Sequence, residues 1–291
     1  MATGQRILGG IGEAFADRNF RIYSVGSVAS WLSFFVQIVA VAWLTWELTG
    51  STTWLAIMAL LDILPNVLLL PLGGALADRF DRFRIMVLVD SLLLLQAVAM
   101  AVLAWTGWLT IWPLAALVLI HGCLISFTVP AMYGMLPRFV EKSRLVAAIA
   151  VNSSYTQLAI FAGPAMAGWI ITFHSITDAF AVNALGYAIH LVSLVFLRAP
   201  AGYCQPRSTN KTIGGDIVEG LRYIREHRTI AALLMLLLVG DALGAATYHM
   251  APAYSELILG RGVDGVSILL AAIGELVVEK AGVLNLGVEG M

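Results

Sequence analysis

Charged residues are scarce in this sequence. Only 12% of the 291 residues are Asp, Glu, Lys or Arg, whereas 60% are hydrophobic. A soluble domain carries about 25% charged residues. Apolar runs longer than the ~20 residues needed to cross a bilayer recur along the chain, and the mean hydropathy is +0.88. The composition excludes a soluble globule and predicts an all-α integral membrane protein embedded in a lipid bilayer.

Cysteine is almost absent as well. Cys123 falls in an apolar run and Cys204 in a polar segment, which excludes a disulfide framework and a cysteine-rich metal site. The sequence also lacks a catalytic triad, a metal-ligand cluster and the Lys-Ser/Thr ending that a phosphate-binding glycine loop requires. We therefore expect no enzyme activity, no cofactor, no metal and no nucleic-acid partner.

The apolar runs define the predicted membrane spans. An eighth span is expected to begin near residue 263. The first seven are predicted at 22–46, 53–77, 85–105, 109–134, 146–171, 177–197 and 229–251.

Lys and Arg are missing from every second connection. All but two of the 17 lie in the N-terminus, near 79–84, near 138–144 or in 198–228, and none lies in 47–53, 106–110 or 173–179. Basic loops stay in the cytoplasm. This asymmetry predicts a multi-pass protein of a bacterial-type inner (plasma) membrane, with a cytoplasmic N-terminus.

The spans divide the chain into five predicted parts. Six closely spaced spans followed by a polar linker make half of a common transporter plan, in which two halves enclose a site at the bilayer midplane. The parts are the cytoplasmic N-terminus 1–21, the six-span bundle 22–197, the cytoplasmic linker 198–228 with its probable helix "IVEGLRYIREHR", the start of a second half at 229–273, and the tail 274–291.

Charge is concentrated in one short loop, "GGALADRFDRFR" at 73–84. It resembles the signature of the major facilitator superfamily between spans two and three. The resemblance implies a conformational gate: the loop packs against a second-half helix, the small glycine permits close approach, and the aspartate faces a helix N-terminus. A plain positive-inside loop is the alternative. Asp81 stands where many members have glycine. The matching residues are Gly74, Asp78, Arg79, Arg82 and Arg84.

A second resemblance lies in span five, in "AIFAGPAMAGWI". Gly163, Pro164 and Gly168 are similar to the Gly-Pro motif of antiporter-type members, although helix packing alone also accounts for such residues. Further stretches, among them "DRNFRIY" and "WELTGS", resemble the enterobactin-exporter and drug-efflux subgroup over about 13–273. This resemblance implies proton-driven export of small amphipathic organic molecules by alternating access.

Polar residues inside the spans are the candidates for proton coupling or substrate contact. Two stripes are expected to face a cavity because their residues share a helix face. The α-helical spacing i, i+4 relates Asp62 to Asn66, and the spacing i, i+4, i+7 relates Asn183, Tyr187 and His190. The remaining candidates are Asp90, His121 and Asp241.

Each of the ionisable candidates also has a structural interpretation. Asp90 lies about two turns from the basic loop and would there pair with Arg82 or Arg84. Asp62 would be solvated by water, and a histidine packed among helices is commonly structural. These alternatives stay open at the level of the sequence.

The end of the chain points to a competing class. "LLAAIGELVVEKAGVLNLGVEGM" at 269–291 resembles a segment of sugar or nucleoside ABC-transporter permeases, which implies an ATPase partner. A nontransporting membrane remnant is a third possibility. The sequence predicts a truncated or fused product with little transport by itself, unless a second copy or a separate second-half chain supplies the other bundle.

Overall fold

The computed structural model describes residues 12, 15–141, 144–197, 213–263, 265, 266, 268 and 269, and these contain helices and no strands. The predicted all-α class is therefore confirmed. The helices are α2 (Arg18–Thr49), α3 (Thr52–Arg79), α4 (Arg82–Trp105), α5 (Ile111–Phe139), α6 (Leu145–Phe173), α7 (Ile176–Val195), α8 (Ile213–Glu226) and α9 (Arg228–Leu257).

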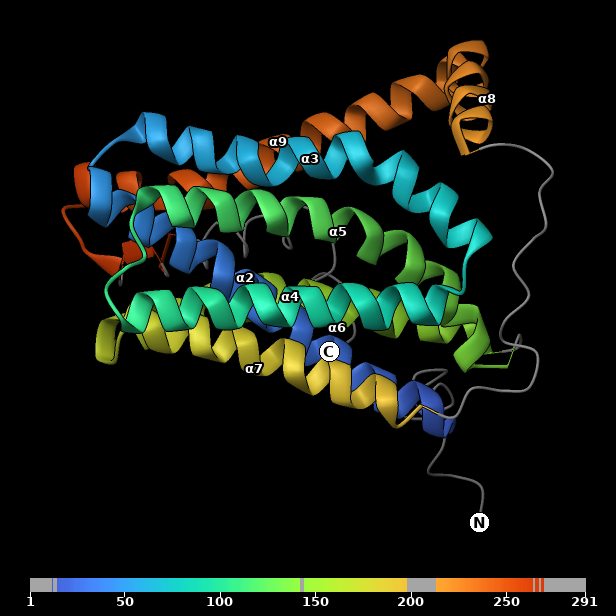
Figure 1. The fold of residues 1–291 in the computed structure, drawn as a ribbon, viewed down its shortest axis with the longest axis horizontal. Coiled ribbons are helices and arrows are strands. Elements are labelled where there is room, and N and C mark those ends of the chain that lie inside the picture. Colours follow the sequence, from blue (N-terminus) through green and yellow to red (C-terminus); the bar gives the residue numbers. More distant parts are fainter. Residues whose placement is uncertain are drawn as a thin grey trace, which may run out of the picture.

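Helices α2 to α7 form a bundle in which helices that follow one another in the chain run in opposite directions (Figure 1). Six helices of the described chain are long and apolar enough to cross a membrane, and they are these six. Within the bundle, α2 packs against α6 and α7, α4 packs against α5 and α7, and α3 packs against α5. Their bounds lie within about five residues of the predicted spans, because hydropathy records where the apolar surface ends and not where the helix ends.

Short connections hold successive helices antiparallel. Gly50 ends α2 in the left-handed region at φ 56° and donates its backbone N–H to the Trp46 carbonyl. Asp81 is the N-cap of α4 and accepts a hydrogen bond from the Phe83 backbone at 3.0 Å. A side-chain carboxylate satisfies one of the unpaired N–H groups that begin a helix. The aspartate that departs from the family pattern thus has a local structural role.

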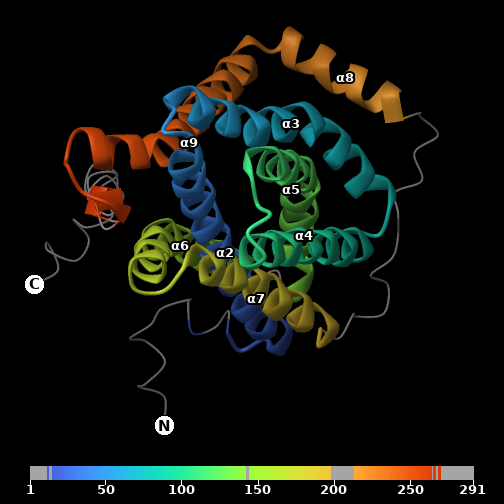
Figure 2. The same ribbon diagram turned by 60° about the vertical axis from the view of Figure 1, so that its left-hand side comes forward.

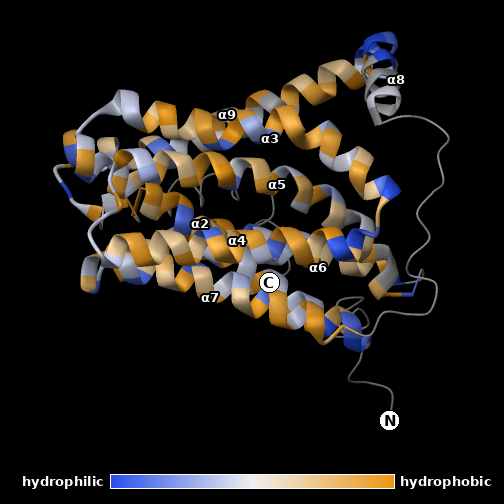
Figure 3. Ribbon diagram, viewed as in Figure 1, coloured by the Kyte–Doolittle hydropathy of each residue, from blue (hydrophilic) through white to orange (hydrophobic). Residues whose placement is uncertain are grey.

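The most hydrophilic residues of the bundle gather at one end (Figure 3). Because the chain alternates direction, α2 begins, α3 ends, α4 begins and α6 begins at this end, with Arg18, Arg79, Arg82 and Arg144 beside them. We call it the basic end. The pattern is that of a bundle whose ends lie in water and whose waist lies in hydrocarbon.

Helix α9 adds a seventh long helix beside the bundle. Its 30 residues include the predicted span 229–251, and it contacts α2 and α3 (Figure 2). Trp46 Nε1 donates a hydrogen bond to Glu256 Oε2, and the Phe35 and Tyr248 rings lie 5.8 Å apart. That α9 crosses the bilayer stays a prediction. The tail 274–291 lies outside the described residues, as does almost all of the eighth span.

Helix α8 falls within the predicted linker, where helix was expected. It spans Ile213–Glu226 and contacts both α3 and α9. Figure 1 shows it across the end of α9.

Candidate functional site

A central cavity of about 350 Å³ opens between the bundle and α9. Residues of α2, α3, α5, α6 and α9 line it, and most of them are apolar. Both members of the α3 stripe, Asp62 and Asn66, lie on its wall, as the sequence predicts. The other polar side chains in the wall are His121, Tyr248 and His249.

The ionisable centre of this cavity is a carboxylate–imidazole pair. Asp62 Oδ1 lies 2.8 Å from His121 Nδ1, and 17% of the Asp62 side chain is exposed against 3% of His121. The Phe34 ring stacks on the His121 ring with 5.6 Å between centroids. A carboxylate and an imidazole in direct contact can hold one proton between them.

A glycine makes this pair possible. Helix α5 carries Gly122 next to His121, and a Cβ atom at Gly122 would lie 2.3 Å from the Asp62 carbonyl oxygen. Only glycine permits this approach of the α3 and α5 backbones. Hydropathy and spacing gave no indication of the contact, because it depends on how two helices are rotated against each other.

The α7 stripe does not line this cavity, contrary to the prediction. Asn183, Tyr187 and His190 are all at least 97% buried. Asn183 Nδ2 donates a hydrogen bond to the Ser33 carbonyl of α2 at 2.9 Å. The physical reason is the position of α7, which packs against both α2 and α4, so that protein atoms cover its polar face.

Asp90 also has a partner that the sequence did not predict. Its Oδ2 lies 3.1 Å from His190 Nδ1, and the two side chains are 1% and 4% exposed. The alternative pairing of Asp90 with Arg82 or Arg84 is not the one formed, because Arg82 contacts Asp78 at 2.7 Å and Arg84 contacts Asp81 at 3.6 Å. Asp90 points into the bundle and not toward the loop.

The signature loop closes the basic end of α3 and α4. Arg82 donates to the Ala77 carbonyl at 2.8 Å and to the Gly134 carbonyl of α5 at 3.0 Å, which ties the loop to the bundle. A Cβ at Gly74 would meet nothing within 4 Å, whereas one at Gly73 would lie 2.3 Å from the Ser126 carbonyl oxygen. The close approach within this chain is therefore made by Gly73, and Gly74 is open.

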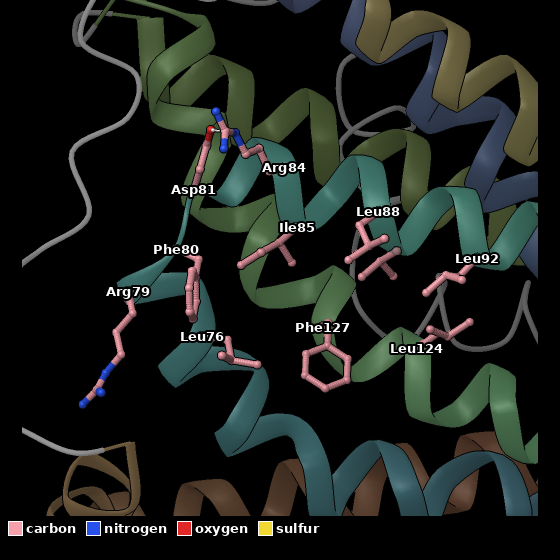
Figure 4. Close-up of a pocket in the computed structure, with 11 residues that line it drawn as sticks. Leu76, Arg79, Phe80, Asp81, Arg84, Ile85, Leu88, Leu92, Leu124 and Phe127 are labelled. Carbon is pink, nitrogen blue, oxygen red and sulfur yellow. Dashed lines mark ion pairs between the residues drawn. The ribbon is translucent and has the colours of Figure 1, made fainter.

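An apolar groove of about 690 Å³ adjoins this loop (Figure 4). Leu76, Phe80 and Phe127 lie along it, the Asp81–Arg84 ion pair stands at one end, and Arg79 extends away from it (Figure 4). The loop residues thus have an unfilled surface next to them at the edge of the bundle.

The Gly-Pro segment of α6 packs against α2. A Cβ at Gly163 would lie 2.4 Å from the Phe35 Cβ, and Pro164 and Gly168 are buried in the same helix. Small residues here permit close helix packing. Asp241 belongs to α9, but its side chain lies outside the described residues.

Sequence reasoning missed two polar residues of the site, Tyr248 and His249. They lie at the end of the predicted seventh span, and a histidine there was a signal for an intramembrane polar site. His249 is 2% exposed, and with Gln37, Asp62 and His121 it lines a smaller pocket next to the central cavity.

Fold and site together define a class: an all-α, multi-pass membrane protein whose cavity lies between a six-helix bundle and the long helix α9. That architecture is the one expected of a facilitator-type transporter.

Comparison with known proteins gives the family. Residues 13–285 match the transmembrane secretion effector family, and the chain belongs to this family of major facilitator transporters. The match reaches into the tail that resembles an ABC permease. The chain is accordingly a multi-pass bacterial membrane protein.

Three relatives illustrate the family. The chain is 24% identical over 217 residues to macrolide efflux protein A of Streptococcus pyogenes, covering 75% of this chain and 53% of the relative. It is 28% identical over 229 residues to the uncharacterized MFS-type transporter YfiS of Bacillus subtilis, with the same coverage. It is 27% identical over 218 residues to the multidrug efflux pump Tap of Mycobacterium tuberculosis, covering 72% and 51%. The chain thus spans about half the length of these relatives.

Proposed function

We propose that this protein exports small amphipathic organic molecules, with macrolide-like cations among them, in exchange for protons. The Asp62–His121 pair on the wall of a mostly apolar cavity carries this proposal. The efflux function in the names of two relatives supports it. Cavities of about 300–1,000 Å³ with a few polar groups suit small-molecule ligands.

The chemistry of the pair accounts for exchange. An Asp62 carboxylate in an apolar wall needs a cationic partner, and either a protonated His121 or the amine of a substrate supplies one. Protons entering from the acidic side displace the substrate amine from Asp62, and loss of the proton on the other side restores the binding site. Substrate and proton are therefore alternative occupants of one carboxylate.

Export also requires alternating access, in which the binding site opens to one side of the membrane at a time. We place the substrate between the α2–α7 bundle and a second bundle that begins with α9, and we assign the gate between the two to Gly74, Asp78, Arg79, Arg82 and Arg84. Gly163, Pro164 and Gly168 provide the α2–α6 contact around which the bundle closes. A second copy of this chain or a separate second-half chain is the proposed partner.

The basic end faces the cytoplasm in this proposal. Single cysteines placed at Asp81 and Lys211 should resist an impermeant maleimide in intact cells, whereas one at Gly50 should react. Each variant is made in a background without Cys123 and Cys204. Ready labelling at 211 and protection at 50 would reverse the orientation.

Everted membrane vesicles containing the chain test export. With an imposed pH gradient, acid inside, labelled erythromycin should accumulate, and a protonophore should abolish the accumulation while vanadate leaves it unchanged. Asp62→Asn should remove the dependence on pH, because the amide keeps the shape of the carboxylate without titrating. Glu47→Gln is the matched control, because Glu47 is an exposed carboxylate near the end of α2 that lies opposite the basic end.

The outcomes separate the alternatives. Accumulation that requires ATP and stops with vanadate would favour the ABC-permease interpretation. If a second copy is the partner, the rate per chain should fall as the purified chain is diluted in liposomes. Absence of gradient-driven accumulation at every protein density would exclude a second copy as the partner. Absence of accumulation with a co-expressed second-half chain as well would refute the proposal and leave a nontransporting remnant.

A further inference from the structure

A second carboxylate–imidazole pair lies deeper in the bundle than the cavity pair. Asp90 of α4 and His190 of α7 have 3.1 Å between Oδ2 and Nδ1. Neither atom makes a hydrogen bond among the described residues, although the two lie this close. A buried pair of this kind has unmet bonding capacity, which one shared proton satisfies best.

The two pairs differ in depth. Asp62 and His121 each lie about ten residues, or ~15 Å, from the helix ends opposite the basic end. Asp90 lies only about eight residues, or ~12 Å, into α4 from the basic end, and His190 about five residues from the same end of α7. The pairs are therefore arranged in sequence from the cavity toward the basic end.

Tyr187 stands between them. Its hydroxyl lies 3.5 Å from His121 Nε2, at the limit of a hydrogen bond. It belongs to the same buried apolar cluster as Val89 and Leu93, the α4 residues that flank Asp90 in the sequence. The charges of both Asp90 and Asp62 act on its hydroxyl, and His190 follows one turn later on the same helix.

Close helix contacts seal the inner pair. A Cβ at Gly26 of α2 would lie 2.9 Å from His190 Cδ2, and the Tyr23 ring lies 6.3 Å from the His190 ring. The titratable groups set against the pair are thus Tyr23 from α2 and Tyr187 from α7, with His121 of α5 and Asp62 of α3 beyond Tyr187. No Arg or Lys forms an ion pair with Asp90 in the described part of the chain.

We propose that Asp90 and His190 form an inner proton site, which exchanges protons with the Asp62–His121 pair by way of Tyr187. This inference rests on the proposed function for its purpose, which is to carry protons between the cavity and the basic end. A carboxylate and an imidazole in contact are together neutral with one proton. Without this proton the Asp90–His190 pair carries a net negative charge. It therefore takes up a proton from the Asp62–His121 pair when the latter holds one.

Infrared difference spectroscopy of the purified chain tests the inner site without substrate or gradient. Between about pH 9 and about pH 6, a range in which exposed carboxylates stay ionised, two protonated-carboxyl C=O bands should appear. Asp62→Asn should remove one and Asp90→Asn the other, and each substitution should shift the titration midpoint of the remaining band. Glu47→Gln should leave both bands and both midpoints unchanged.

Two further variants guard against a folding defect. His190→Gln keeps the Asp90 carboxyl and should still shift its band. Tyr187→Phe keeps both carboxyls and should slow the filling of the Asp90 site several-fold after a pH jump. Circular dichroism monitors helix content in every variant.

The inner site would be refuted if both Asp90→Asn and His190→Gln left the spectrum unchanged. That result would mean that Asp90 and His190 form a permanent ion pair, which does not titrate. Two bands that titrate independently would overturn the exchange with the cavity pair. Loss of erythromycin export with both coupled bands intact would refute the proposed function and leave the inner site standing.

Discussion

The polar stripes of α3 and α7 have similar spacing in the sequence and opposite surroundings in the structure. Asp62 and Asn66 of α3 lie on the wall of the central cavity. Asn183, Tyr187 and His190 of α7 are buried between helices. The difference arises from the neighbours of the two helices, since α3 packs mainly on α5 and has α9 across the cavity, whereas α7 is held against both α2 and α4.

The comparison separates two uses of polar groups inside a membrane protein. Polar groups of the α3 stripe border space that a ligand or water can occupy. Those of the α7 stripe form contacts with other helices, where an unpaired group is costly. We therefore expect α3 substitutions to change function with little loss of stability, and α7 substitutions to lower stability.

The largest loss of stability is expected where the backbone of α3 contacts α5, next to the α3 stripe. Gly122→Ala would put a Cβ 2.3 Å from the Asp62 carbonyl oxygen. Because backbone cannot yield as a side chain does, α3 and α5 should move apart, at a cost of about 1–3 kcal/mol. The thermal unfolding midpoint of the detergent-purified chain should fall.

Gly74→Ala is the matched control in α3. Its Cβ would meet nothing within 4 Å, and alanine is favoured over glycine in a helix by up to about 1 kcal/mol. Its midpoint should stay the same or rise. Equal midpoints for the two variants would show that α5 does not support α3 through Gly122.

A second pair of substitutions compares the two stripes directly. Asn183→Ala removes the 2.9 Å hydrogen bond to the Ser33 carbonyl and leaves a gap between α7 and α2, which should cost roughly 1–3 kcal/mol. Asn66→Ala removes an amide at the cavity wall and should cost less than about 0.5 kcal/mol. Unfolding midpoints of the two variants, measured side by side, test this. A greater loss for Asn66→Ala would invert the comparison.

The sequence was sufficient for the class, the first six spans and the membership of each stripe. Long apolar runs make spans visible, and helical spacing shows which residues share a face. The pairs Asp62–His121 and Asp90–His190 were not predictable, because each depends on which helices are neighbours and how they are rotated. Asp90 illustrates this: its closest charges in sequence, Arg82 and Arg84, are engaged elsewhere by Asp78 and Asp81.

The glycines that permit close contacts between helices were the hardest features to predict from the sequence. The family pattern drew attention to Gly74, whose surroundings within the described chain are open, whereas Gly73 and Gly122 make the close backbone contacts. A glycine at a helix contact and one on an open face look alike in a single sequence. Only the packed structure distinguishes them.

The smallest expected difference between the two stripes is in the rate at which a cysteine in each stripe reacts with a chemical label. In a background without Cys123 and Cys204, Asn66→Cys should react with a small membrane-permeant maleimide, because position 66 borders the cavity. Asn183→Cys should react much more slowly, because the native side chain there is fully buried and the reagent must wait for a local opening of the α2–α7 contact. Mass spectrometry of the purified variants gives both rates.

Glu47→Cys provides the rate for an exposed position. Position 66 should approach this rate, since a wall position in a hydrated cavity admits a small reagent. Mild warming should accelerate labelling at position 183 more than at position 66, because only the buried site needs the helices to separate. Equal rates at 66 and 183 would mean that the α7 stripe is as accessible as the α3 stripe, and would place both stripes in the same water-filled space.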